Sequence, residues 1–226
     1  MEKQNLGDHV TEMSSSTVSI KPETDSALGM PALHYKRTPG YRRAEVKALQ
    51  RGGLQANKQY YIGYTIRLSH AAPSLVIFQW KKQDKNASPQ QNIPFHLTFK
   101  GSKSGTEHLA LEYTTPGSNG SNRTAIWEGT FSTGNTGADV HKLGFVIDTN
   151  DGCGGALEFW LDGTRQLKRN DLCLWTGSTY PKWGIYRGEA SPGSKDPASW
   201  HTFNSYVYRV QVSDSSKAEV AESAGW

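Results

Sequence analysis

Hydrophobic and polar residues alternate with a period of two over most of the chain, the pattern of half-buried β-strands. The clearest apolar stripe is formed by every second residue of segment 60–68, namely Tyr60, Ile62, Tyr64, Ile66 and Leu68. Runs rich in Val, Ile, Thr, Tyr, Phe and Trp are separated by clusters of Gly, Pro, Asn and Ser, and helical periodicity is almost absent. We expect strands at residues 15–20, 31–37, 41–49, 59–69, 74–82, 93–100, 107–113, 124–132, 140–148, 155–161, 164–169, 181–188 and 203–213.

A dozen or so strands in 226 residues predict an all-β fold. The expected architecture is a jelly-roll sandwich of two antiparallel sheets, with a concave sheet face on which a linear polymer can lie. The even pattern favours one domain spanning residues 1–226. Residues 214–226 show no periodicity, so we expect an irregular tail there.

Charge and hydropathy exclude some classes of function. The net charge is +4 with a pI near 9.0, yet no Lys/Arg block of the kind found in nucleic-acid binders is present. No run of 18 apolar residues exists, so we expect no membrane span. The mild basicity is compatible with a polyanionic substrate, and we expect a monomer.

The two cysteines and three glycosylation sequons favour secretion. Cys153 and Cys173 flank a segment that reads as a hairpin turning at residues 162–163, Asp-Gly, and a hairpin brings its ends together. We therefore expect a disulfide. Asn86, Asn119 and Asn122 each begin an N-x-S/T sequon in a polar stretch. The N-terminus is polar and shows no signal peptide, so we interpret the sequence as a mature or recombinant form that starts at an added Met1.

The most informative segment is YPKWGIY at 180–186. As a strand it places Tyr180, Lys182 and Tyr186 on one face with a glycine between, and Pro, Trp and Ile on the other. One face is apolar enough for a core. The other aligns two phenols and an ammonium, which suits it to hold and deprotonate an anionic ligand.

Two further strands carry polar residues opposite an apolar face. In segment 41–49 the polar face includes Arg43 and Lys47, with Glu45 between them. In segment 74–82 we expect Val76, Phe78 and Trp80 on one face, opposite Ile77, Gln79 and Lys81. If the three strands are neighbours, they form a cationic groove that also bears amide and phenol groups.

These segments resemble motifs of jelly-roll polysaccharide lyases. R-A-E-V-K at 43–47, Q-W-K at 79–81 and Y-P-K-W-G-I-Y at 180–186 are similar to R-[ST]-E-L-R, Q-[IV]-H and Y-F-K-A-G-x-Y-N of the family 7 alginate lyases, in the same order. The overall likeness is closer to polysaccharide lyase family 20, the fungal glucuronan lyases, and covers about residues 15–212. The resemblance implies a secreted enzyme that cleaves a polyuronate.

The resemblance also implies residue roles. Tyr186 matches the catalytic tyrosine, Gln79 the glutamine that binds the substrate carboxyl group, Arg43 the motif arginine and Lys182 the motif lysine. We expect further substrate contacts from Tyr180, Lys81, Lys47 and His96.

One residue departs from the alginate-lyase pattern. Lys81 stands two residues after Gln79, where those enzymes have histidine. An imidazole, if it takes part, must come from another strand, and His96 and His34 are the candidates.

The chemistry of such a lyase suits these residues. The enzyme removes the proton at C5 of a 4-linked uronate and expels the oxygen at C4, after donors neutralise the neighbouring carboxylate. In β-1,4-linked glucuronate both groups leave from the same side, so a single tyrosine can serve as base and acid. A free phenol has a pKa of about 10, so its ionisation at pH 7 costs roughly 4 kcal/mol unless cations lie near. We therefore expect syn elimination on glucuronan.

Two other classes of function stay open. A lectin-like jelly-roll domain would bind acidic sugars without cleaving them. A glycoside hydrolase needs two carboxylates about 5–9 Å apart, commonly displayed as E-x-D-x-x-E on one strand. The nearest stretch, Glu158 to Asp162, sits at a hairpin and lacks the third acid of that motif. The elimination needs no cofactor. For a structural calcium ion, the candidate ligands are acidic residues near the chain ends, Glu2, Glu23 and Asp214.

Overall fold

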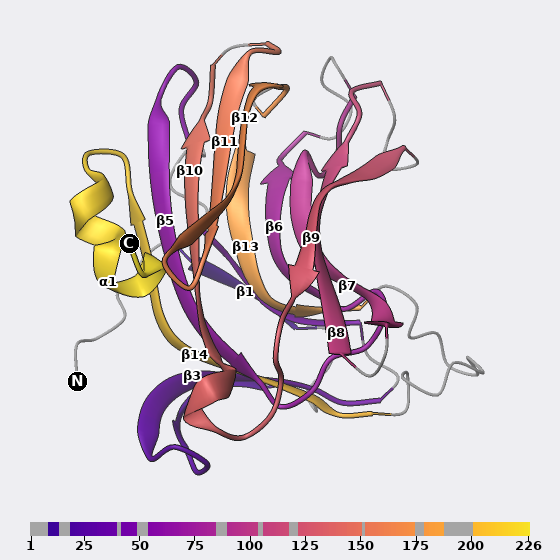
Figure 1. Ribbon diagram of the computed structural model, residues 1–226, viewed down its shortest axis with the longest axis vertical. Coiled ribbons are helices and arrows are strands. Elements are labelled where there is room, and N and C mark those ends of the chain that lie inside the picture. Colours follow the sequence, from indigo (N-terminus) through magenta and orange to yellow (C-terminus); the bar gives the residue numbers. More distant parts are fainter. Residues whose placement is uncertain are drawn as a thin grey trace.

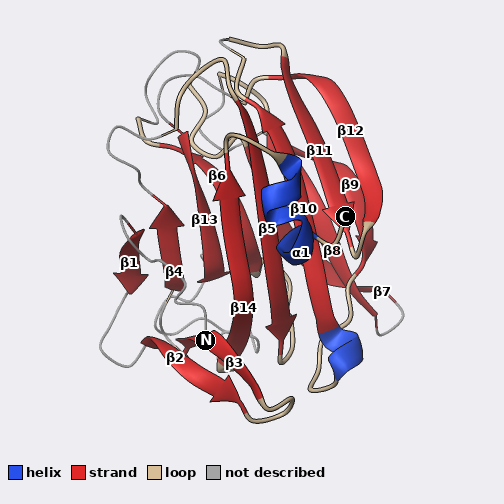
Figure 2. Ribbon diagram, turned by 90° about the vertical axis from the view of Figure 1, so that its left-hand side faces the viewer, coloured by secondary structure: helices blue, strands red, loops and turns tan. Residues whose placement is uncertain are grey.

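The computed structural model describes residues 9–13, 19–39, 42–48, 54–84, 90–103, 106–117, 122–150, 152–174, 179–187 and 201–226. The regular secondary structure of these residues is almost all β-strand, in two stacked sheets of seven strands each (Figures 1 and 2). Sheet A has the strand order β1-β4-β13-β6-β7-β8-β9, and sheet B has the order β12-β11-β10-β5-β14-β3-β2. Every strand pairing is antiparallel. The predicted jelly-roll sandwich is confirmed.

The strands are β1 His9–Met13, β2 Ser19–Asp25, β3 Met30–Arg37, β4 Arg43–Ala48, β5 Gln59–Leu68, β6 Val76–Lys82, β7 Phe95–Lys103, β8 Thr106–Thr114, β9 Arg123–Thr130, β10 Val140–Asp148, β11 Gly155–Leu161, β12 Thr164–Leu172, β13 Thr179–Tyr186 and β14 Phe203–Ser213. Short helical turns are η1 Gly137–Asp139, η3 Lys217–Val220 and α1 Ala221–Ala224. No helix in the described ranges is long and apolar enough to cross a bilayer.

Aromatic rings from both sheets form the centre of the core. Phe78 of β6 stacks on Phe145 of β10 with ring centroids 4.3 Å apart, and Phe145 stacks on Phe159 of β11 at 5.3 Å. Trp80 and Phe95 of sheet A continue the cluster and are fully buried. Since successive residues of a strand point to opposite faces, the apolar half of each alternating stripe fills this core and the other half faces outward.

The hairpin and the disulfide are as predicted. Strands β11 and β12 pair in antiparallel fashion around Asp162 and Gly163, whose φ angles are 50° and 80°. Two consecutive residues with positive φ are typical of the tight turn that Asp-Gly favours. The disulfide joins Cys153 and Cys173, whose Cα atoms lie 4.0 Å apart.

The N-terminal and C-terminal expectations need correction. The predicted strand at 15–20 lies mostly outside the described residues, and the strands found near it are β1 and β2. The expectation of an irregular tail at 214–226 is wrong, because η3 and α1 pack on β5 (Figure 2). Val220 and Ala224 are fully buried, and the ring of Trp226 lies 5.6 Å from that of Trp160. Two short turns contribute too few apolar residues to show a helical period.

The C-terminal segment of η3 and α1 packs on sheet B at Gly63, which has no side chain to keep it away. A Cβ atom at this position would lie 2.8 Å from the backbone nitrogen of Ala224 and from the backbone oxygen of Val220. We predict that Gly63→Ala displaces the helical tail and lowers the free energy of unfolding by about 1–3 kcal/mol, the usual cost of overpacking. Chemical denaturation measures this. Gly137→Ala is the control, since nothing lies within 4 Å of its added Cβ, and an equal loss in both variants would contradict the docking role.

Candidate functional site

The three polar strands singled out in the sequence are neighbours in sheet A. Strand β13 lies between β4 and β6. Lys182 of β13 is directly opposite Lys47 of β4 and Gln79 of β6, and Tyr186 is opposite Arg43. Trp183 and Ile185, the residues between them, belong to the core. The predicted division of this segment into an apolar and a polar face is confirmed.

Gly184 explains why the motif requires a glycine. Its φ is +125°, a conformation that residues with side chains rarely adopt. A Cβ there would lie 2.4 Å from the backbone oxygen of Ala44 on β4. The pairing between β13 and β6 is irregular from Trp183 to Tyr186, on either side of this residue. The glycine therefore allows close approach to β4 and sets where Tyr186 meets β6.

The carboxylate of Glu45 organises the polar face. It accepts a hydrogen bond from Gln79 Nε2 at 2.5 Å and contacts Lys182 Nζ at 2.9 Å, while Arg43 Nη1 lies 3.7 Å away. The side chains of Glu45 and Lys182 are only 2% and 1% exposed. A buried charge is tolerated when paired in this way. Lys182 is thus bound to Glu45, which differs from the substrate contact expected of it.

Tyr186 is joined to this network by Arg43. The guanidinium carbon lies 4.8 Å from the centroid of the Tyr186 ring, in a cation–π contact. The chain of contacts Tyr186–Arg43–Glu45–Gln79 shows that the phenol and the amide share one face of sheet A.

A pocket of about 460 Å³ opens beside Tyr186. It is lined by Ser74, Val76, His96, Thr98, Phe99, Lys100, Glu112, Arg123 and Tyr186. These residues come from strands β6, β7, β8, β9 and β13 and from the segment before β6. Of the predicted site residues, only Tyr186 and His96 line this pocket, so it places the phenol and an imidazole in one cavity with the cations Lys100 and Arg123.

His96 and Glu112 form a buried pair within the pocket. His96 Nε2 lies 3.0 Å from Glu112 Oε2, and the two side chains are 3% and 8% exposed. Burial lowers the pKa of His96, and Arg123 and Lys100 act in the same direction, against the effect of Glu112. The hydrogen bond with His96 lowers the pKa of Glu112 to about 2, with a further contribution from Lys100. For the pKa of His96 the lowering by burial exceeds the raising by the Glu112 carboxylate, so we conclude that His96 is neutral and Glu112 is ionised.

The lowered pKa of Glu112 predicts a pH-dependent contribution to stability. A carboxylate whose pKa falls from 4.5 to about 2 on folding stabilises the protein fully above pH 4.5 and loses this effect as the pH falls towards 2. The free energy of unfolding of the native protein should therefore exceed that of Glu112→Gln near neutrality and converge with it in that window. Denaturation at a series of pH values measures the gap. Glu128→Gln, exposed on β9, is the control, and a gap that stays constant with pH would contradict the assignment.

Strand β6 departs from the predicted alternation. Ile77 belongs to the core together with Phe78 and Trp80, whereas Val76 lines the pocket. The expected positions of Val76 and Ile77 are therefore wrong. The cause is a shift in the β6–β7 register between Val76 and Phe78, which breaks the period of two.

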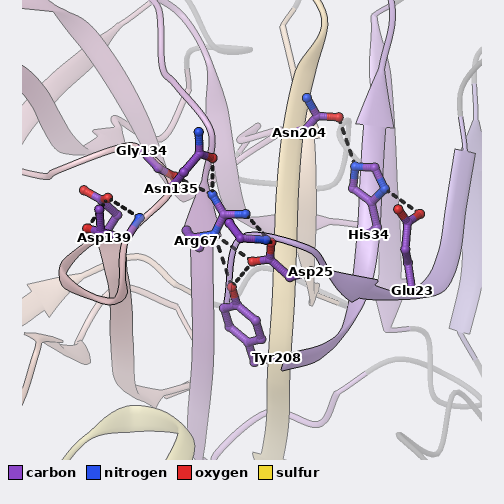
Figure 3. Close-up of polar contacts among 11 residues, drawn as sticks. Glu23, Asp25, His34, Arg67, Gly134, Asn135, Asp139, Asn204 and Tyr208 are labelled. Atoms are coloured by element: carbon purple, nitrogen blue, oxygen red, sulfur yellow. Dashed lines mark hydrogen bonds and ion pairs between the residues drawn. The ribbon is translucent and has the colours of Figure 1, made fainter. Parts of the chain in front are cut away.

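His34 does not line this pocket, and its own contacts are drawn in Figure 3. It lies on β3 of sheet B, where Nδ1 contacts Glu23 Oε2 at 3.1 Å and Nε2 contacts Asn204 Oδ1 at 3.0 Å. Its neighbour in the figure is the buried pair Asp25–Arg67, 2.6 Å apart. Of the two candidate histidines, only His96 lines the pocket.

The remaining predicted residues lie at the edge of the site or outside the described residues. Lys47 and Lys81 are half-buried, Lys81 is bonded to Asn92, and Tyr180 is directly opposite Lys81. The described residues contain no group of three or more His, Cys, Asp or Glu able to hold a metal ion.

Glu23 binds Lys21 and His34, and Asp214 binds Lys58, so these two guessed calcium ligands serve other partners. Glu2, Asn86 and Asn119 lie outside the described residues, and Asn122 is exposed.

Several pocket residues were not predicted. Glu112 lies between Leu111 and Tyr113 on β8, so its place on the face opposite these core residues was readable from the sequence, but its partner was not. Glu45, which lies outside the pocket, was recognised only as the residue between Arg43 and Lys47 on the polar face of segment 41–49. Lys100 and Arg123 became site residues through the strand order, which brings β7 and β9 to either side of β8.

Comparisons with known proteins bear on the fold. No family model and no curated protein matches the chain. Among solved structures, the endo-β-1,4-glucuronan lyase from the fungus Trichoderma reesei aligns with a TM-score of 0.62 and 15% identity, covering 93% of this chain and 92% of that one. An alginate lyase from Pseudomonas aeruginosa aligns with a TM-score of 0.59 and 14% identity, covering 87% and 86%. A family 7 alginate lyase in complex with substrate aligns at 0.58 and 12%, covering 88% and 82%. The chain shares the two-sheet fold of these polysaccharide lyases.

Proposed function

We propose that this protein is a polysaccharide lyase that cleaves a 4-linked polyuronate by β-elimination, with β-1,4-glucuronan as its substrate. The observation that carries the proposal is Tyr186 in a pocket of about 460 Å³, under the guanidinium of Arg43. The fold shared with alginate and glucuronan lyases supports it.

Each residue of the polar face has a part in the proposed reaction. Arg43 neutralises the substrate carboxylate with its fork of donors. The Gln79 amide carries two N–H groups, and Glu45 accepts one of them, which holds the amide in place for a second acceptor. Tyr186 removes the C5 proton and returns it to the departing C4 oxygen. Lys182 acts indirectly, by fixing the Glu45 carboxylate.

The surroundings extend the proposed groove. Lys47, Lys81 and Tyr180 would contact neighbouring sugar units at the β4 and β6 end of the face. Lys100 and Arg123 add positive charge within the pocket. We further propose a secreted monomer, since a disulfide closes the β11–β12 hairpin and Asn122, which begins a sequon, is exposed.

A panel of polyuronates tests the proposal. The purified chain is incubated with glucuronan, alginate, hyaluronan and a heparin-type chain while ultraviolet absorbance is followed. We expect absorbance from unsaturated uronate ends to rise with glucuronan. Saturable binding without new absorbance would favour a lectin-like domain, and new reducing ends without absorbance a hydrolase, and either result would overturn the proposal.

A further inference from the structure

A serine, a histidine and an aspartate form a hydrogen-bonded row outside the pocket described above. Ser132 belongs to the segment that links β9 of sheet A to β10 of sheet B, His141 lies on β10, and Asp162 lies in the β11–β12 turn. Ser132 Oγ is 3.0 Å from His141 Nε2, and His141 Nδ1 is 2.7 Å from Asp162 Oδ2. This is the order of groups that a nucleophile, its base and the residue orienting the base require.

The backbone of β10 holds Asp162 in place. Its N–H donates to the carbonyl of Lys142 at 2.8 Å, and its Oδ1 accepts from the N–H of Lys142 at 2.8 Å. Oδ2 is left to His141. Burial raises the pKa of Asp162, but the hydrogen bonds from His141 and from Lys142 lower it by more. The ionised carboxylate only accepts hydrogen bonds, so Nδ1 of His141 carries a proton.

Nε2 of His141 is therefore the nitrogen that serves the serine. The imidazole is buried, with its side chain 10% exposed, and its ring lies 3.9 Å from that of Phe131. Nε2 lies 3.0 Å from the Ser132 hydroxyl and 3.2 Å from the Ser132 carbonyl oxygen. A charged ring donates to these oxygens, while the hydroxyl donates to the carbonyl of Ala138 at 3.2 Å. A neutral ring has a lone pair on Nε2 that accepts the hydroxyl proton, so loss of one proton turns His141 into a base.

A second carboxylate near the row is held by another residue. Asp139 (Figure 3) accepts from the N–H and the hydroxyl of Thr136 at 2.9 and 2.7 Å. These bonds lower the pKa of Asp139, with smaller contributions from Ser132 and His141. Asp139 thus adds negative charge beside His141, while Asp162 makes the direct contact with its ring.

Another serine and histidine of the described chain meet at the same distance without such support. Ser69 Oγ lies 3.0 Å from His70 Nδ1. Nε2 of His70 is buried and makes no hydrogen bond to any described residue. Burial lowers the pKa of His70, and His201 acts in the same direction. This pair provides a matched comparison for the role of the carboxylate.

We infer that Ser132 is a nucleophile activated by His141, with Asp162 as the positioning residue, and that the protein hydrolyses carboxylic esters of short acyl groups. Ser132 is exposed and does not line the pocket of about 460 Å³. An ester therefore reaches it from solvent. Because an exposed serine offers no enclosed space for a long chain, a small acyl group such as acetyl fits best.

The reaction balances with water as the second reactant. Ser132 Oγ forms a bond to the acyl carbon, and its proton passes to His141 Nε2. The ester C–O bond breaks, and the leaving oxygen takes that proton and departs as an alcohol. Water then attacks the acyl carbon, gives a proton to Nε2, and releases the carboxylic acid as Ser132 recovers its own proton. Asp162 stays ionised and stabilises the imidazolium that forms in each half.

Hydrolysis of p-nitrophenyl acetate tests the activity. We expect saturable release of nitrophenol by the native protein, and kcat/KM lower by about 100-fold in Ser132→Ala and in His141→Gln, within the usual range for a general base. Ser69→Ala is the control and should keep the native rate. A native protein without saturable hydrolysis would overturn the inference, as would a Ser132→Ala variant within a few-fold of the native rate.

Covalent labelling of the unmodified protein tests the nucleophile without relying on how a variant folds. Diisopropyl fluorophosphate should add to Ser132 as its Oγ displaces fluoride, and peptide mass mapping locates the adduct. Ser69 should stay unlabelled, and prior denaturation should abolish the reaction. A native protein unlabelled at Ser132, or labelled equally at Ser69, would contradict the assignment.

The pH dependence of labelling isolates the role of Asp162. In Asp162→Asn the pH at which the labelling rate rises should move downward, because the lost negative charge no longer favours the imidazolium. A purely structural role would lower the rate without moving this pH, and that result would remove Asp162 from the inferred arrangement.

Discussion

Tyr186→Phe should abolish elimination on glucuronan, lowering kcat by about 10²–10⁴-fold, the usual contribution of a positioned acid or base. The variant loses one oxygen atom and keeps the ring on which Arg43 stacks at 4.8 Å. Since no hydrogen bond of the hydroxyl with a described residue is observed, we expect the melting temperature to change little. Initial rates of absorbance increase and a thermal melt provide both numbers.

Tyr61→Phe is the matched control for this substitution. Tyr61 lies on β5 of sheet B and its hydroxyl donates to Gln59. The variant should keep its activity on glucuronan. Turnover by Tyr186→Phe within a few-fold of the native rate would remove Tyr186 from the chemistry.

Glu45→Ala should lower the free energy of unfolding by about 3–5 kcal/mol, the usual cost of removing one member of a buried ion pair. The substitution takes from the buried Lys182 ammonium the carboxylate 2.9 Å away, and from Gln79 its acceptor at 2.5 Å. It also removes the group near which Arg43 lies. We therefore expect lost activity together with lost stability, measured by chemical denaturation and by the glucuronan assay.

The control for Glu45→Ala is an exposed ion pair, so that the comparison isolates the effect of burial. Lys58 and Asp214 form an ion pair at the same 2.9 Å distance, with side chains 41% and 47% exposed. Asp214→Ala should leave the denaturation midpoint unchanged within error, because water and salt screen an exposed pair. Equal effects of the two substitutions would mean that Glu45 does not hold the polar face together.

The alternation of residues predicted most of the fold and the centre of the site. A period of two separates Trp183 and Ile185 from Lys182 and Tyr186 whatever the neighbouring strands are. The polar face of β13 could therefore be recognised before its partners were known. The same reasoning found the β11–β12 hairpin, because its Asp-Gly turn is a local signal.

What escaped prediction depends on contacts between strands. Ile77 lies in the core and Val76 at the pocket, the reverse of the expectation, because of a register shift between β6 and β7. A strand's own sequence does not reveal such a shift. The pairing of His96 with Glu112 requires the register of β7 on β8, where the two residues are directly opposite. The role of Gly184 depends equally on its approach to β4. These are tertiary features, which appear only when the strands are paired.

The mass of the products made from glucuronan tests the central claim most directly. Elimination gives oligosaccharides with an unsaturated end, lighter by one water than the fragments that hydrolysis would give. We predict that mass spectrometry of the digest shows the lighter series, with hydrated masses confined to fragments that keep the original non-reducing end of the polymer. The lighter series should disappear with Tyr186→Phe. A digest of hydrated fragments, or an intact polymer that is bound but uncut, would contradict the account.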